Sequence, residues 1–216
     1  MNQFEAALLR YISADNLAKI QKVKVGIAGA GGLGSNCAQF LVRSGFRKLK
    51  IADFDVVDYS NLNRQFYFSS QVGGLKLEAL KDNLRLINSA LEVELLPVKV
   101  SAANIAELFI DCDVVVEAFD NPDLKRLIVE QYLNSGKLLV AASGLAGWGN
   151  SDRIRVHRVK ENFYLVGDLV TGIGPNSPPL APCVTIAAAK QADVILSHVL
   201  GVMKGGMSDA DATGNG

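Results

Sequence analysis

Short apolar runs alternate with amphipathic stretches along most of this chain. Five strands are expected from the apolar runs, at 23–28, 48–52, 92–98, 114–118 and 137–143. Between them, apolar residues recur every three or four positions, which is the spacing of a helix with one buried face. Such helices are expected at 33–44, 75–88, 104–109 and 123–134. Strands that alternate with helices predict an α/β fold with a parallel sheet. The run at 114–118 is interpreted as a continuous apolar strand, typical of a sheet buried on both faces.

The two ends of the chain differ from this alternating region. Residues 1–21 predict an arm of one or two short helices before the main domain at 22–201. After the fifth strand, 153–158 and 162–166 predict an antiparallel hairpin with its turn at Lys160-Glu161. A long loop rich in Gly and Pro follows at 167–181, and loops of this length in a compact domain tend to be functional. A last helix is expected at 182–200, and the small polar tail at 202–216 predicts disorder.

A glycine turn joins the first strand to the first helix of the main domain. Its glycines are Gly29, Gly31, Gly32 and Gly34. Such a turn directs free N–H groups and the positive end of a helix dipole at an anion. Asp53 follows the turn at the end of the next strand, where nucleotide-binding folds place the acid that binds ribose. The residues therefore predict a nucleotide, with its phosphate at the turn, but the turn alone does not separate NAD, FAD and ATP.

Two further charged residues are candidates for the same site. Asp120 follows the strand 114–118, and ligands of α/β sheets gather beyond the carboxyl ends of strands. Two carboxylates, Asp53 and Asp120, would repel a nucleotide unless a cation such as Mg²⁺ lies between them. Asp120 has a second interpretation, as the N-cap of the helix at 123–134. Lys76 stands in the first turn of a helix, where it opposes the helix dipole, so it is either a ligand for an anion or a solvated lysine.

Composition narrows the class of protein. The chain has 216 residues, 49% of them hydrophobic, and a formal net charge of +0. This balance argues against a nucleic-acid or membrane surface built on bulk charge. No signal-peptide pattern and no apolar run long enough to span a membrane occurs, so a cytoplasmic protein is expected.

The cysteines and histidines offer little further chemistry. Cys37, Cys112 and Cys183 include no CxxC pair, so neither a zinc site nor a disulfide framework is expected. Cys37 and Cys112 are interpreted as core residues. Cys183 stands where the last helix begins, which can lower the pKa of a thiol, and it is the only candidate reactive thiol. The two histidines, His157 and His198, have no partner at metal-ligand spacing and are interpreted as structural.

Several motifs together resemble the ThiF/MoeB family, the bacterial relatives of ubiquitin-activating enzymes. They are GAGGLG at 29–34, DFD at 53–55, SNLNRQ at 60–65, the helix start Gly74-x-Lys76 and FDN at 119–121. The chain is most similar to the short proteins called thiamine-biosynthesis ThiF family 2. The resemblance implies a Rossmann-like doubly wound sheet, mostly parallel, with a C-terminal antiparallel hairpin and a final helix.

The resemblance also implies an activity. In that family, ATP adenylates the C-terminal glycine carboxylate of a small ubiquitin-like sulfur carrier of the ThiS kind, which ends in Gly-Gly, and pyrophosphate is released. The pathway implied is thiamine or related sulfur-cofactor biosynthesis. Arg64, Lys76 and Asp120 would be catalytic, and Asp120 would hold Mg²⁺. The other nucleotide-binding residues implied are the four glycines of the turn, Asp53, Asp55 and Asn61, together with Arg64 and Lys76.

The chain departs from the family pattern in three respects. The two CxxC pairs of the larger zinc-containing members are missing, so no zinc is expected. The loop at 167–181 has no cysteine where sulfur-transferring members place one, which supports adenylation without a covalent step. A homodimer is implied, in which an N-terminal arginine of one subunit reaches the other's site. Here Ser13 occupies the matching position, and Arg10 is a weak candidate.

Three alternatives share part of the pattern. An enzyme like the tRNA threonylcarbamoyladenosine dehydratases would use the same ATP motifs, although the net charge of zero does not favour a tRNA surface. An NAD-dependent oxidoreductase would use the glycine turn and Asp53 but leaves Arg64, Lys76 and Asp120 unexplained. A scaffold that binds a nucleotide or a carrier without catalysis is the third alternative, and the intact Arg64 and Asp120 argue against it.

Overall fold

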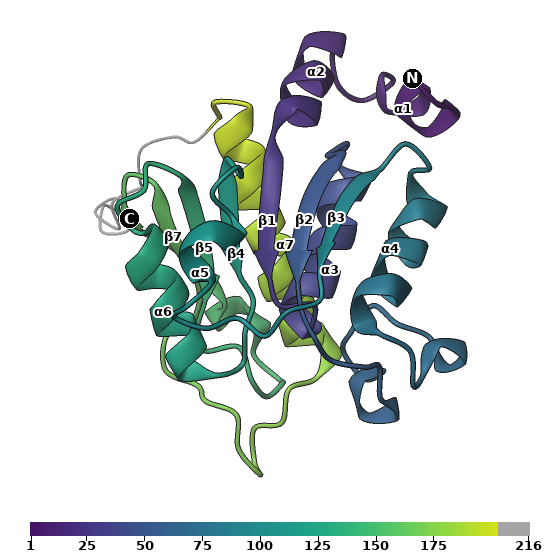
Figure 1. Cartoon of the computed structure of the whole chain (residues 1–216). Coiled ribbons are helices and arrows are strands. Elements are labelled where there is room, and N and C mark those ends of the chain that lie inside the picture. The colour runs from purple at the N-terminus through teal and green to yellow at the C-terminus, as the bar shows by residue number, and fades with distance from the viewer. Residues whose placement is uncertain (203–216) are drawn as a thin grey trace, which may run out of the picture.

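A seven-stranded sheet forms the centre of the molecule (Figure 1). The structure is a computed structural model and describes residues 1–202. The strand order is β3-β2-β1-β4-β5-β7-β6, and every neighbouring pair is parallel except β6 with β7. This confirms the predicted fold class. The strands are β1 (Lys24–Ala28), β2 (Lys48–Ala52), β3 (Glu92–Leu96), β4 (Val114–Glu117), β5 (Leu138–Ala142), β6 (Arg155–Lys160) and β7 (Phe163–Gly167).

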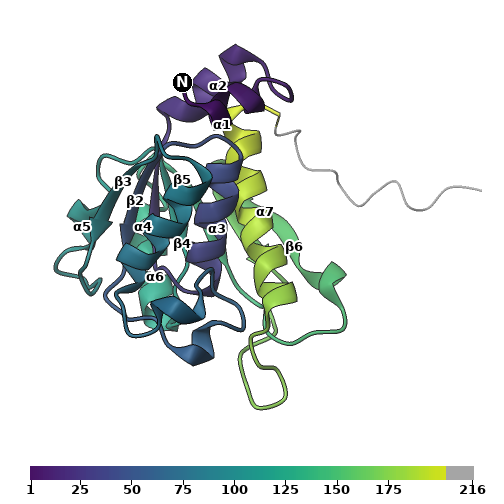
Figure 2. The ribbon, with the colours of Figure 1, turned by 90° about the vertical axis from the view of Figure 1, so that its right-hand side faces the viewer.

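Helices cover both faces of the sheet. The helices are α1 (Gln3–Leu8), α2 (Ala14–Lys22), α3 (Gly32–Arg43), α4 (Lys76–Ile87), α5 (Ile105–Leu108), α6 (Pro122–Tyr132) and α7 (Ala181–Val199). One core cluster packs α3, α4 and α7 against one face, and a second packs α5 and α6 against the other. Figure 2 shows α3 and α7 side by side along the first face, and the two helices contact each other extensively.

The strands divide their side chains between these two cores. In β4, Val114 and Val116 belong to the cluster under α3 and α7, while Val115 belongs to the cluster under α5 and α6. This alternation follows from the two-residue period of a strand. Because both faces are covered by helices, the central strands are apolar at almost every position.

The predicted hairpin is present, with its polar strand at the edge of the sheet. β7 lies between β5 and β6, and its side chains are mostly buried. β6 is mostly exposed and begins at Arg155. The expected strand start at Arg153 is wrong, because Ser151–Arg153 forms a short 3₁₀ turn.

The N-terminal arm consists of two short helices that pack on the main domain. Ser13 caps α2 by accepting a hydrogen bond from the Asn16 N–H at 3.2 Å. Leu17 and Ile20 are buried, and Ile20 joins the larger core cluster. Figure 1 shows this arm at the end of the sheet opposite the carboxyl ends of the parallel strands. The division of the chain at residues 21 and 201 stays a prediction, and all but the first residue of the predicted tail at 202–216 lies outside the described residues.

Over residues 1–202, no helix combines the length and the apolar character needed to cross a bilayer.

Candidate functional site

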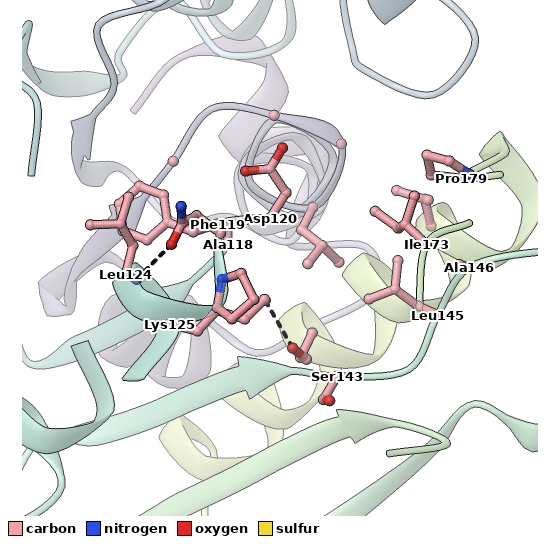
Figure 3. A pocket seen from close by; sticks show the side chains of 18 of the residues that line it. Ala118, Phe119, Asp120, Leu124, Lys125, Ser143, Leu145, Ala146, Ile173 and Pro179 are labelled. Atoms are coloured by element: carbon pink, nitrogen blue, oxygen red, sulfur yellow. Dashed lines mark hydrogen bonds between the residues drawn. The ribbon is translucent and has the colours of Figure 1, made fainter. Parts of the chain in front are cut away.

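A pocket of about 710 Å³ opens at the carboxyl ends of β1, β2 and β4. Segments that are far apart in the sequence meet there, including the glycine turn, the 60–65 loop and the start of α4. Figure 3 shows Asp120 at this pocket, with Ile173 and Pro179 of the long loop on the far side. The predicted site residues that line it are Gly29, Gly31, Gly32, Asp53, Asp55, Arg64, Lys76 and Asp120.

The glycine turn leaves the first amides of α3 facing this pocket. Gly29 has φ +106°, and a Cβ there would lie 2.9 Å from the Ala118 carbonyl oxygen. Gly31 occupies the N-cap position of α3, and no side chain caps this helix. A helix N-terminus without a side-chain cap has free N–H groups that suit an anion.

Asp53 links the turn to the end of β2. Its Oδ2 accepts the Ala30 N–H at 2.7 Å, and its Oδ1 accepts the Asp55 N–H at 2.8 Å. Each carboxylate oxygen keeps a second lone pair, which is what a ribose hydroxyl needs. The carboxylate is therefore oriented before any ligand arrives.

Arg64 is carried by a loop that is tied to α3. The Asn36 side chain, which is buried, donates to the backbone oxygens of Gly32 at 2.6 Å and Arg64 at 2.7 Å. Nη1 of Arg64 donates to the Ser60 oxygen at 3.2 Å and to Asn63 Oδ1 at 2.7 Å. Both of the bonds that this guanidinium makes within the described chain start from Nη1, which leaves the other N–H groups for a ligand.

Lys76 is a buried cation at the pocket end of α4. It is the first residue of that helix and is 6% exposed. Its Nζ forms an ion pair with Asp55 Oδ2 at 2.8 Å. The alternative of a solvated lysine is therefore wrong. A helix dipole alone would disfavour a cation here, so the neighbouring carboxylate has to compensate for it.

Asp120 does not cap α6. The cap is Asn121, whose Oδ1 accepts the N–H groups of Asp123 at 2.8 Å and Leu124 at 3.1 Å. The N-cap interpretation of Asp120 is therefore wrong, and its exposed carboxylate is free to face the pocket (Figure 3).

Gly34 and Asn61 do not line the pocket. A Cβ on Gly34 would lie 1.8 Å from the Gly29 carbonyl oxygen, so this glycine allows α3 to pack on the turn. Asn61 Oδ1 accepts the Asp58 N–H at 3.0 Å and closes a 3₁₀ turn. Their predicted nucleotide contacts stay predictions, while the structure gives both residues a packing role.

The carboxylates at the pocket suit a metal ion that is bound partly by the protein and partly by a substrate. Across residues 1–202, no group of three or more His, Cys, Asp or Glu side chains lies close enough to hold a metal ion alone. Mg²⁺ is commonly held by one or two carboxylates together with substrate phosphates. The exposed carboxylate of Asp120, beside a pocket with anion-binding groups, fits that mode.

The three thiols are buried. Burial raises the pKa of Cys37 and of Cys112 to about 12. Cys183 lies in the first turn of α7, but its side chain points into the core, with the residue 1% exposed. Its sulfur lies 4.0 Å from Nη2 of Arg153. This burial does not favour a reactive thiol at Cys183.

The long loop at 167–181 closes one side of the pocket. The sequence predicted that this loop is functional but did not assign it to the pocket. Leu169 has φ +66°, an uncommon conformation for a residue with a side chain, and it lines the pocket. Asp168 holds the loop by accepting from Thr171 Oγ1 at 2.5 Å and from Arg153. Burial alone would raise the pKa of Asp168, but the hydrogen bonds from Thr171, Val170 and Arg153 outweigh it and hold it well below its usual range.

Two charged residues were not predicted from the sequence, Lys125 at the pocket and Glu117 behind it. The predicted continuous apolar strand at 114–118 is wrong at Glu117, which is a carboxylate at the end of β4 and is 1% exposed. Lys125 of α6 pairs with it, at 3.1 and 3.0 Å from the two oxygens, and lines the pocket. In the sequence, the only indication of this pair is one acid, Glu117, directly after three valines of a strand that is expected to be buried.

The chain has a Rossmann-like fold with a pocket at the carboxyl ends of its parallel strands. The chain belongs to the ThiF family, whose family model matches residues 5–208.

Curated relatives with a significant match include two fungal proteins called "Adenylyltransferase and sulfurtransferase UBA4". The protein from Candida glabrata is 32% identical over 197 residues, which cover 85% of this chain and 44% of that protein. The protein from Eremothecium gossypii is 39% identical over 132 residues, which cover 61% of this chain and 30% of that protein. The chain therefore spans less than half the length of these relatives.

Solved structures with a similar fold include those of two proteins from E. coli. The tRNA N6-threonylcarbamoyladenosine dehydratase TcdA, in complex with AMP, matches with a TM-score of 0.82 and 19% identity, over 91% of this chain and 93% of that chain. MccB, in complex with MccA-N7isoASN, matches with a TM-score of 0.72 and 21% identity, over 94% of this chain and 65% of that chain. At this level of identity the likeness concerns the fold.

Proposed function

We propose that this chain binds ATP and adenylates the C-terminal glycine carboxylate of a small ubiquitin-like carrier protein. The observation that carries the proposal is the convergence of Asp53, Arg64, Lys76 and Asp120 with the glycine turn on one pocket. An NAD-dependent oxidoreductase would need the turn and Asp53 but has no use for two cations and an exposed acid beside them. The name of the UBA4 relatives supports adenylyl transfer.

We assign each part of ATP to one region of the pocket. The phosphates belong at the free amides of α3, and the ribose hydroxyls belong at Asp53. The base fits the apolar side of the pocket beyond Asp53, where Lys99 lies 5.8 Å from the centre of the Phe54 ring. The apolar residues on this side are Ala52, Val98, Val100, Ala118, Phe119 and Leu124.

The chemistry needs positioning and charge neutralisation. A carrier carboxylate oxygen forms a bond to the α-phosphorus, the bond from that phosphorus to the bridging oxygen breaks, and pyrophosphate leaves. The nucleophile is already ionised, so no general base is required. Arg64 and Lys76 neutralise charge that grows on the phosphate oxygens. Both cations are fixed before the ligand binds, Arg64 through its loop and Lys76 through Asp55.

Asp120 is the residue that would hold Mg²⁺ in this scheme. The ion supplies charge neutralisation and orientation of the leaving pyrophosphate. Asp55 also lines the pocket, but its carboxylate is engaged by Lys76.

The acceptor would reach the pocket along the long loop. Leu145, Ile173 and Pro179 form an apolar wall that lies across the pocket from Asp120 (Figure 3). A chain end without large side chains, such as Gly-Gly, passes such a wall without a clash. The smaller hollow beside it, of about 300 Å³, shares Ala146 and Thr171 with the main pocket and extends this path.

The edge strand β6 offers a docking position for the carrier. Its side chains include Arg155, Arg158 and Lys160 and no acid. A strand added antiparallel to β6 would run in the same direction as β7, whose carboxyl end lies beside the pocket loops. A carrier docked by such strand addition would have its C-terminus directed at the pocket end of the sheet.

We also propose a pathway and an oligomeric state for this chain. The ThiF resemblance supports thiamine or related sulfur-cofactor synthesis as the setting. The proposal ends at the adenylate, since the loop at 167–181 has no cysteine and Cys183 is buried. We also propose a homodimer, for which the arm offers Tyr11, 84% exposed, as a contact, and sedimentation would test it.

A second candidate is a tRNA-modifying activity like that of TcdA. It is favoured by the match of this chain to 93% of the length of that enzyme, against 44% for the Candida glabrata relative. The basic edge of β6 suits RNA as well as an acidic protein.

One experiment separates the two candidates. ATP binding is measured first by calorimetry, and ATP–pyrophosphate exchange is then followed with carriers that end in Gly-Gly and with bulk tRNA. Exchange that depends on a carrier supports the main proposal. ATP turnover that depends on tRNA alone supports the second candidate, and NADH binding without ATP binding contradicts both.

A further inference from the structure

An ion pair between the buried Glu117 and the partly exposed Lys125 lies directly behind the loop that carries Asp120. Glu117 is 1% exposed, and its two carboxylate oxygens accept hydrogen bonds from Lys125 Nζ at 3.1 and 3.0 Å. The same Nζ donates at 3.0 Å to the carbonyl oxygen of Ala142, which is the last residue of β5. The pair therefore joins the ends of β4 and β5 to the first turns of α6.

Lys125 directs most of its hydrogen bonding at the protein. An ammonium group has three N–H donors; one is shared by the two oxygens of the Glu117 carboxylate, and a second meets the Ala142 oxygen. Its side chain lines the pocket, and the carboxylate that it pairs with is buried. Lys76, in contrast, pairs with Asp55, whose side chain is 51% exposed.

Glu117 holds the loop from behind. Besides the two bonds from Lys125, its Oε1 accepts the Phe119 N–H at 2.7 Å, and Phe119 directly precedes Asp120. On the other side, the Asn121 cap fixes the start of α6. Gln191 of α7 donates to the Glu117 carbonyl oxygen at 3.2 Å, so the loop is anchored to the helix behind it as well. Asp120 therefore stands on a short loop that is bonded at both ends.

We propose that Lys125 is a positioning residue for the adenylation site, and that it acts through Glu117 to fix Asp120 where it meets the metal–nucleotide complex. This inference rests on the proposed function. Supporting groups behind a metal ligand typically change metal affinity by about 10- to 100-fold when they are removed.

Charge explains why the pair acts as a unit. An ionised carboxylate is costly to bury unless it is paired and hydrogen-bonded. Burial raises the pKa of Glu117, and Lys125 is the charge that opposes this shift. Without Lys125, Glu117 would take up a proton or draw in water, and the bond to Phe119 N–H would lose its charged acceptor.

The test compares Lys125→Met with Lys125→Arg and with Asp120→Asn. ATP affinity is measured by calorimetry with and without Mg²⁺. Lys125→Met is expected to weaken Mg²⁺-dependent binding by about tenfold, with ATP affinity in EDTA within about twofold of wild type. Asp120→Asn should show the same selective loss, and Lys125→Arg should retain more of the affinity than Lys125→Met, because Arg keeps the charge and has N–H donors.

A second readout needs neither metal nor nucleotide. Hydrogen exchange at the Phe119 amide should be at least about tenfold faster in Lys125→Met, with exchange in α3 unchanged. If Lys125→Met does not fold, Glu117→Gln is used in both measurements with the same expectations, since Gln keeps the size of the side chain and removes its charge.

The outcomes are distinct. Equal loss of ATP affinity with and without Mg²⁺ would make Lys125 a direct phosphate ligand and overturn the positioning role. Unchanged binding and unchanged Phe119 exchange would overturn it as well. If the wild-type protein binds no ATP under any condition, the proposed function fails and the positioning role fails with it.

Discussion

Lys76 Nζ lies 2.8 Å from the Asp55 carboxylate, and both residues line the same pocket. The lysine is buried, whereas the Asp55 side chain is 51% exposed. The pair therefore fixes a cation at the base of the pocket and leaves the outer carboxylate in solvent. An arriving phosphate would share Lys76 with Asp55, and neither side chain needs to move far.

Loss of the Lys76 charge should abolish most of the adenylation activity. Lys76→Met is expected to lower carrier-dependent ATP–pyrophosphate exchange on the order of 100-fold, the range seen when one transition-state donor is removed. Lys81→Met is the matched control, because Lys81 lies on the same helix and pairs only with Glu78 within the described chain. Similar losses in both variants would contradict a specific role for Lys76.

The thiols should be unreactive in the folded protein. Cys37 and Cys112 have raised pKa values, and Cys183 is 1% exposed. An aromatic disulfide reagent should therefore modify the native chain more than about 100-fold more slowly than the unfolded chain, because modification requires local opening. Cys183→Ala should leave exchange activity within about twofold of wild type. Rapid modification of Cys183 in the native state would restore it as a reactive thiol.

Acid should remove the stabilisation that Asp111 provides. The hydrogen bonds from Lys24 and then Lys50 lower the pKa of Asp111 to about 2. A carboxylate with a depressed pKa stabilises the fold above its ordinary value of about 4, and this stabilisation is lost as the pH falls towards 2. The difference in free energy of unfolding between wild type and Asp111→Asn should therefore be largest above pH 4 and should decrease towards zero as the pH falls.

Denaturant titrations from pH 6 to pH 2 would measure this difference. Asp82→Asn serves as the control, since Asp82 is exposed on α4 and makes no side-chain hydrogen bond within residues 1–202. A difference between wild type and Asp111→Asn that stays constant over this range would contradict the ion-pair network at Asp111.

Gly34 should tolerate no side chain. A Cβ there would lie 1.8 Å from a backbone oxygen, so Gly34→Ala forces the turn and α3 apart and should destabilise the fold by about 3 kcal/mol. Gly172→Ala is the control, because a Cβ at Gly172 meets no atom within 4 Å, and its stability should change by less than about 0.5 kcal/mol. Thermal unfolding of the two variants would measure both effects, and equal stability would show that the turn repacks freely.

The sequence predicted helices and strands well where the spacing of apolar residues fitted only one of the two. The strand at 48–52 was predicted with the bounds that it has in the structure, because Gly45 precedes it and the acid Asp53 follows it directly. The order of β6 and β7 in the sheet was not predicted. It follows from polarity, since the apolar β7 takes the inner position and the charged β6 the edge.

The site was predicted in part, for a physical reason. Glycines and acids at strand ends can be recognised as candidate site residues from their position in the sequence. Asp53 and Asp120 do line the same pocket. Which polar residue caps α6 depends on backbone angles, so Asp120 and Asn121 could not be told apart. Glu117 was overlooked because its partner Lys125 is eight residues away, and only the fold brings the two together.

Carrier-dependent ATP–pyrophosphate exchange tests the central claim most directly. The wild-type chain is assayed with a β-grasp carrier that ends in Gly-Gly and with the same carrier lacking its last glycine, and Asp120→Ala is assayed beside it. We expect exchange with the intact carrier, none with the shortened carrier, and none with Asp120→Ala. Equal exchange with both carriers, or full exchange in Asp120→Ala, would contradict adenylation of a terminal carboxylate at this pocket.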